Sequence, residues 1–61
     1  MKYSELKRLL RAYGCSYVKS GGEHDRWYSP LTDSFFYLPR HDSKEVPKGM
    51  LKRITKEAGI E

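Results

Sequence analysis

The stretch from Lys19 to Arg26, which reads Lys-Ser-Gly-Gly-Glu-His-Asp-Arg, holds the residues of this chain best suited to chemistry. A glycine turn delivers His24 to the start of an expected strand, with a cation on either side. Imidazole transfers protons near neutral pH, and flanking cations are what a phosphodiester substrate requires. A lone histidine is also a common polar surface residue, so this stretch by itself leaves both interpretations open.

The composition is that of a small basic chain. Its 61 residues include 12 Lys and Arg against 8 Asp and Glu, which gives a net charge of +4. That balance mildly favours a polyanionic partner. Cys15 is the only cysteine, which excludes an intrachain disulfide and a zinc site with two thiolates. Apolar runs are too short for a membrane span or a secretory signal, so we expect one soluble cytoplasmic domain over residues 1–61.

Apolar periodicity predicts a helix near each end of the chain. Ser4 is the expected N-cap of the first helix, and Gly14 suits the left-handed position after its end. Pro47 fits the first turn of the second helix, which Gly59 ends with Ile60 packing back. The apolar stripes consist of Leu6, Leu9, Leu10 and Tyr13 in the first helix and of Leu51, Ile54 and Ala58 in the second.

Three short strands are predicted between the helices. Aromatic and β-branched residues place them at 15–19, 24–29 and 34–38, with turns at Gly21-Gly22 and at Pro30–Asp33. Short connections favour an antiparallel meander, and two helices with one apolar stripe each should cover the same face of the sheet. The expected fold is therefore α+β with the order α-β-β-β-α, as in a double-stranded-RNA-binding domain.

Strand alternation predicts which side chains share a face. The side chains expected to face the helices are those of Val18, Trp27 and Phe36. His24 and Arg26 then lie on the open face, with the carboxylates of Glu23 and Asp25 turned away from it. The aromatic side chains expected on the open face are those of Tyr17, Tyr28, Phe35 and Tyr37. Such a face could stack unpaired bases or be covered by a protein partner.

Three segments in this order resemble the HicA family, the small toxins of bacterial and archaeal HicA–HicB toxin–antitoxin systems. They are Gly22-Glu23-His24, Leu38-Pro39-Arg40-His41, and Lys48-Gly49-Met50-Leu51 leading to Ala58-Gly59-Ile60. The resemblance covers nearly the whole chain. It implies an mRNA interferase of a type II system: a metal-independent endoribonuclease without a cofactor, inhibited by a HicB antitoxin, with His24 as the catalytic histidine. The chain departs from the family pattern at Glu23, where serine is common, and at Asp25 and Cys15.

In such a reaction His24 would remove the proton from a ribose 2′-OH, which then attacks the adjacent phosphorus, so that only RNA is cleaved. The nearest donors to the phosphoryl oxygens are Lys19, Arg26 and the amides of Gly21 and Gly22. The proton donor to the leaving group stays open among His41, a lysine and water.

Further RNA contacts are expected from the second half of the chain. Arg40 and His41 begin an expected polar loop, and Lys48 and Lys52 share one face of the second helix beside Gly49. A solvated lysine face is the alternative. Cys15 is expected to be a packing residue, and no metal site is expected, because His24 and His41 are accompanied by no ligand cluster. Two other functions remain open: a non-catalytic double-stranded-RNA-binding-like module and a protein-interaction domain.

Overall fold

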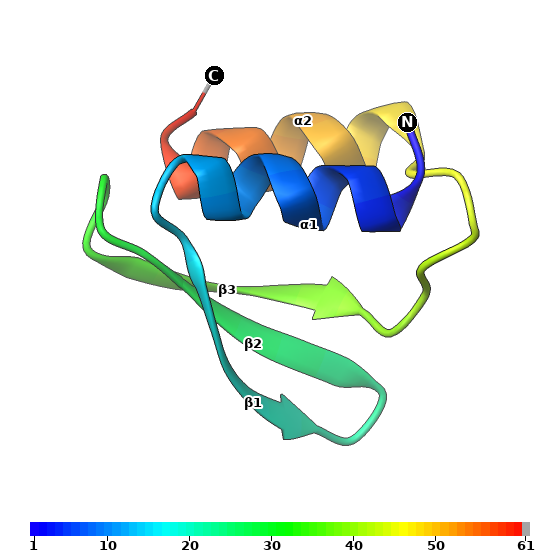
Figure 1. Ribbon diagram of the computed structural model, residues 1–61, viewed down its shortest axis with the longest axis horizontal. Coiled ribbons are helices and arrows are strands. Elements are labelled where there is room, and N and C mark those ends of the chain that lie inside the picture. The colour runs from blue at the N-terminus through cyan, green and yellow to red at the C-terminus, as the bar shows by residue number, and fades with distance from the viewer. Residues whose placement is uncertain (61) are drawn as a thin grey trace.

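In the computed structural model, two helices cover one face of a three-stranded antiparallel sheet and leave the other face open (Figure 1). The structure describes residues 1–60, so Glu61, the last residue of the expected domain, lies outside it. The elements are α1 (Tyr3–Ala12), β1 (Ser16–Gly21), β2 (His24–Ser29), β3 (Ser34–Pro39) and α2 (Lys48–Ala58), and the strand order is β1-β2-β3. The predicted α+β fold is confirmed. Within residues 1–60, no helix is both long and apolar enough to cross a membrane.

The core lies between the helices and the sheet. Trp27 of β2 and Phe36 of β3 are cross-strand partners, and each is 1% exposed, as the alternation predicts. The other fully or nearly buried apolar residues are Tyr3, Leu6, Leu10, Cys15, Leu38, Val46, Ile54 and Ala58. Cys15 is therefore a packing residue, which confirms the prediction for it. Burying two large aromatic rings stabilises the sheet against the helices by several kcal/mol, at about 1.5–3 kcal/mol for each large side chain.

The predicted N-cap at Ser4 is wrong, because α1 begins at Tyr3 with Lys2 as its N-cap. The Lys2 N–H donates to the Glu5 carboxylate across 2.9 Å. The amides of Tyr3 and Ser4 donate to carbonyl oxygens in the loop 40–47, at 3.1 Å each. Carbonyl groups of a distant segment thus accept hydrogen bonds from amides of the first turn, which in other helices are bound by the side chain of the N-cap residue. Local sequence carries no signal for this contact.

The earlier start moves the apolar stripe of α1 toward the N-terminus. Tyr3, Leu6 and Leu10 are buried, whereas Leu9 is half-buried and Tyr13 lies beyond the helix end with 48% of its surface exposed. The predicted stripe was therefore right for Leu6 and Leu10, wrong for Tyr13, and incomplete because it omitted Tyr3.

Glycines end both helices as predicted. Gly14 has a φ of 91° and Gly59 a φ of 76°, in the region that L-residues with a side chain rarely adopt. After Gly59, the Ile60 N–H donates to the Thr55 carbonyl across 3.0 Å, and the Ile60 side chain packs against the core. The second helix thus ends in a compact turn that returns the chain to the core.

A bulge in β1 changes which of its side chains face the core. Tyr17 pairs with Trp27 but Lys19 pairs with Arg26, so Val18 is an extra residue. Tyr17 lies edge-on to Trp27, with ring centroids 6.3 Å apart, and Val18 is 42% exposed. The predictions that Val18 faces the helices and that Tyr17 lies on the open face are wrong. Simple alternation fails at these two positions because the bulge adds one residue to the strand. After the bulge, Lys19 pairs with Arg26 and therefore shares its face of the sheet.

Candidate active site

A pocket of about 430 Å³ lies where the β1–β2 turn meets the segment that follows β3. Its lining residues are Gly22, Glu23, His24, Pro39, Arg40 and His41. Two segments far apart in the sequence therefore meet here, and each contributes one histidine. The meeting follows from the register of the sheet, because Pro39 at the end of β3 pairs with His24 at the start of β2.

The β1–β2 turn places His24. β1 continues through Gly21, one residue into the predicted break, and the turn consists of Gly22 and Glu23. Gly22 has a φ of 61°, which its lack of a side chain permits. His24 pairs with Gly21 on one side, and its side chain is exposed on the open face at the pocket. Glu23 precedes the strand and lines the same pocket, so the strand alternation from which the direction of its carboxylate was predicted does not extend to it.

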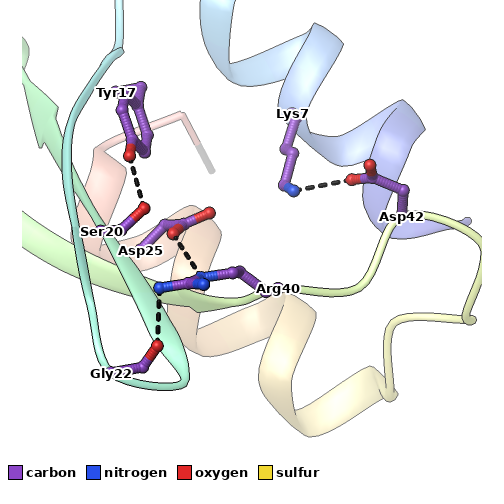
Figure 2. A network of polar contacts seen from close by, with 7 residues as sticks. All are labelled: Lys7, Tyr17, Ser20, Gly22, Asp25, Arg40 and Asp42. Carbon is purple, nitrogen blue, oxygen red and sulfur yellow. Dashed lines mark hydrogen bonds and ion pairs between the residues drawn. The ribbon is translucent and has the colours of Figure 1, made fainter.

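Asp25 lies on the helix-facing side, as predicted, and is 8% exposed. Its partner is Arg40, whose Nε donates to Asp25 Oδ1 across 3.1 Å, while Arg40 Nη2 donates to the Gly22 carbonyl across 2.6 Å. Figure 2 shows the guanidinium lying between the β1–β2 turn and Asp25. Sequence reasoning predicted Arg40 as an RNA contact and missed both of these bonds. The only available signal was the register, which sets Asp25 opposite Leu38 and so brings Arg40 close.

The loop that carries His41 is fastened to α1. The His41 ring lies against Tyr3, with centroids 6.1 Å apart and an interplanar angle of 58°. The next residue, Asp42, accepts a hydrogen bond from Lys7 Nζ at 2.7 Å (Figure 2). That hydrogen bond and the lysine charge hold the pKa of Asp42 below its ordinary value of 3.8. His41 is thereby kept at the pocket although it lies outside regular structure.

The open face beside the pocket carries cations and aromatic rings. Lys19 and Arg26 are cross-strand partners, and no ion pair within residues 1–60 includes either of them. The Arg26 guanidinium lies 3.9 Å from the Phe35 ring centroid. Phe35 and Tyr37 are 48% and 52% exposed, which agrees with their predicted place on this face.

Tyr28 shares the open face with them. Its hydroxyl donates to Asp33 Oδ1 across 2.6 Å, and this hydrogen bond raises the pKa of Tyr28 above its ordinary value of 10.0. The Tyr28 ring lies next to that of Phe35, with centroids 5.3 Å apart.

The lysines of α2 lie apart from this pocket. Lys48 and Lys52 are exposed on α2, and neither lines the pocket. Nothing lies within 4 Å of a Cβ built at Gly49, so the first turn of α2 is open to close approach. Both helices begin at the end of the molecule where the loop after β3 runs (Figure 1). The structure thus brings Gly22, Arg40 and His41 into one pocket with His24. It places Lys19 and Arg26 on the adjoining open face and leaves Lys48 and Lys52 outside the pocket.

Two imidazoles in one pocket can act as base and acid in turn, and nearby cations can stabilise charge on a phosphoryl group. Among residues 1–60, no three His, Cys, Asp or Glu side chains lie close enough together to bind a metal ion.

Comparison with known proteins identifies the family of this chain. Residues 3–60 match the family described as the HicA toxin of bacterial toxin–antitoxin systems. The chain is 40% identical over 60 residues to a probable mRNA interferase HicA 2 of Photorhabdus laumondii, covering 98% of each chain. It is 35% identical over 60 residues to a probable mRNA interferase HicA of Pseudomonas fluorescens, covering 98% of this chain and 97% of that one. No solved structure matches it significantly. This protein belongs to the HicA toxin family.

Proposed function

We propose that the protein is an endoribonuclease that cleaves mRNA with His24 as general base, and that it is the toxin of a type II toxin–antitoxin system. The observation that carries the proposal is the position of His24 on the wall of a pocket, at the edge of a face that carries Lys19 and Arg26. The relatives named as probable mRNA interferases support mRNA as the substrate. Because bacterial mRNA lies in the cytoplasm, we propose the cytoplasm as the place of action.

In the proposed reaction His24 accepts the proton of a ribose 2′-OH. The bond from O2′ to phosphorus then forms as the bond from phosphorus to the 5′-oxygen breaks. The products are a 2′,3′-cyclic phosphate and a 5′-hydroxyl end, and the leaving oxygen takes up one proton. General acid–base assistance of this kind accelerates a reaction by roughly 10²–10⁴-fold. No step needs a cofactor.

His41 is the proposed proton donor to the leaving oxygen. It lines the same pocket as His24 but comes from the segment after β3, so the two rings can approach a phosphate from different sides. This choice among the open candidates rests on the shared pocket. The nearest lysine on the open face, Lys19, lies on β1 and does not line the pocket.

Substrate binding is assigned to two surfaces. Lys19 and Arg26 neutralise phosphates that flank the scissile bond, and the Gly22 backbone leaves room for close approach. Lys48 and Lys52 on α2 contact the RNA further away. Exposed rings on the open face, Phe35 and Tyr37 among them, offer stacking to unpaired bases, each worth about 1–3 kcal/mol. A single-stranded substrate fits these features best.

Inhibition is assigned to a HicB-like antitoxin. A protein that covers His24 together with Tyr28 or Tyr37 would exclude the substrate from the pocket. An acidic surface on that partner would suit Lys19 and Arg26, and association would then be faster at low salt.

The experiment that tests the proposal incubates the purified protein with single-stranded RNA in EDTA. Cleavage that leaves a 2′,3′-cyclic phosphate is expected. The same sequence made of 2′-O-methyl nucleotides should stay intact, because it has no 2′-OH to attack. Binding of both strands without cleavage would favour the non-catalytic binding module. Cleavage that requires added magnesium or manganese would reject the metal-independent mechanism.

A further inference from the structure

Arg40 is bound on two sides by the protein itself. Its Nε donates to Asp25 Oδ1 across 3.1 Å and its Nη2 to the Gly22 carbonyl across 2.6 Å (Figure 2). A guanidinium presents donors in a fixed fork, so one side chain can serve both acceptors at once. The fork joins the segment after β3 to the β1–β2 turn.

The Asp25 end of this link is costly to break. Asp25 is 8% exposed and lies on the helix-facing side of β2, where it pairs with Leu38. A buried carboxylate that loses its cation is left without compensation for its desolvation. Arg40 is the only ion-pair partner of Asp25 within residues 1–60. The Arg40 charge is therefore engaged by Asp25, and moving to a phosphate would leave that carboxylate unpaired.

The Gly22 end fixes a turn of unusual conformation. Gly22 has a φ of 61°, and its carbonyl accepts the 2.6 Å bond two residues before His24. At the other end, Arg40 is followed directly by His41. The link thus joins the two segments that hold the histidines. Its members Gly22 and Arg40 line the pocket together with His24 and His41.

We infer that Arg40 is a positioning residue: the Asp25–Arg40–Gly22 link holds His24 and His41 at a fixed separation across the pocket. This inference rests on the proposed function, and it replaces the expectation that Arg40 contacts RNA. A displacement of about 1 Å in a catalytic group can lower the rate by about 10²-fold, so the link matters to catalysis without touching substrate.

The test uses Arg40→Lys, which keeps the charge but cannot donate in two fixed directions. Its kcat on single-stranded RNA should fall by about 10²-fold while KM stays near the wild-type value. Asp25→Ala should lower kcat similarly, and the double variant should lose little more than either single variant, because both remove one link. Arg53→Lys is the matched control, since its side chain is 53% exposed against 49% for Arg40 and lies outside the pocket.

Binding separates positioning from phosphate contact. Affinity for a 2′-O-methyl RNA should have the same salt dependence in wild type and in Arg40→Gln. A salt slope flattened by about 0.7, the value of one phosphate contact on a single strand, would overturn the inference. Retention of wild-type kcat by Arg40→Lys would overturn it as well.

A third measurement does not depend on activity. The imidazole NMR signals of His24 and His41 should shift in Arg40→Lys and stay in place in Arg53→Lys. This result would support the link even if the wild-type protein proved not to cleave RNA, which would reject the proposed function alone. Unchanged imidazole signals in a folded Arg40→Lys protein would overturn the link itself.

Discussion

His24 and His41 line one pocket from two separate segments, the first at the start of β2 and the second just after β3. The register of the sheet makes them neighbours, because Pro39, at the end of β3, is the cross-strand partner of His24. Because the two imidazoles can approach a phosphate from different sides, we assign the general base to His24 and the general acid to His41.

Loss of the acid should be visible through the leaving group. His41→Gln should slow cleavage of RNA by roughly 10²-fold or more, because an alkoxide leaves poorly without a proton. With uridine 3′-(4-nitrophenyl phosphate), whose phenolate leaves without help, His41→Gln should keep near wild-type activity. His24→Gln should be impaired on both substrates. Equal impairment of His41→Gln on the two substrates would contradict its role as the acid.

The lysines of α2 are expected to bind RNA without reading its sequence. Lys48→Ala combined with Lys52→Ala should weaken binding to all sequences alike and flatten the salt slope by about 1.4, at roughly 0.7 for each phosphate contact on a single strand. Lys56→Ala, on the same helix but near its far end, should leave the slope unchanged. An unaltered slope in the double variant would return Lys48 and Lys52 to the solvated surface.

The Lys7–Asp42 pair should give the fold a small pH dependence. The pKa of Asp42 is lower in the folded protein than its ordinary value of 3.8, so its stabilising effect is present above that value and is lost as pH falls through the folded pKa. Asp42→Asn should therefore lower the urea midpoint slightly at about pH 6 and by less at about pH 3. At about pH 6, the urea midpoints of the wild type and of Asp42→Asn should also come closer together at high salt, because salt screens the ion pair. A variant that is equally destabilised at both pH values would show that the charge is not responsible.

Sequence predicted most of the fold because its signals there are local. The glycines at 14 and 59 mark positions that need a positive φ, and alternation around Trp27 and Phe36 separates the core face from the open face. Alternation also placed His24 and Arg26 on the open face, and the resemblance to the HicA family selected His24.

The predictions from sequence were wrong or incomplete where contacts between segments distant in the sequence determine the structure. The start of α1 depends on carbonyl groups of the loop 40–47, and the bulge at Val18 reverses the faces of Val18 and Tyr17. The engagement of Arg40 by Asp25 and Gly22 follows from strand register and not from any residue near Arg40 in the sequence. The pocket itself could not be predicted, because it exists only where the two strand ends meet.

The cleavage rate of His24→Gln tests the central claim most directly. Single-turnover cleavage of a single-stranded RNA in EDTA should be slower than wild type by roughly 10²–10⁴-fold, which is the usual contribution of a general base. Circular dichroism should be unchanged, since the His24 side chain is exposed and contributes little packing. A His24→Gln protein that folds and cleaves at the wild-type rate would contradict the account.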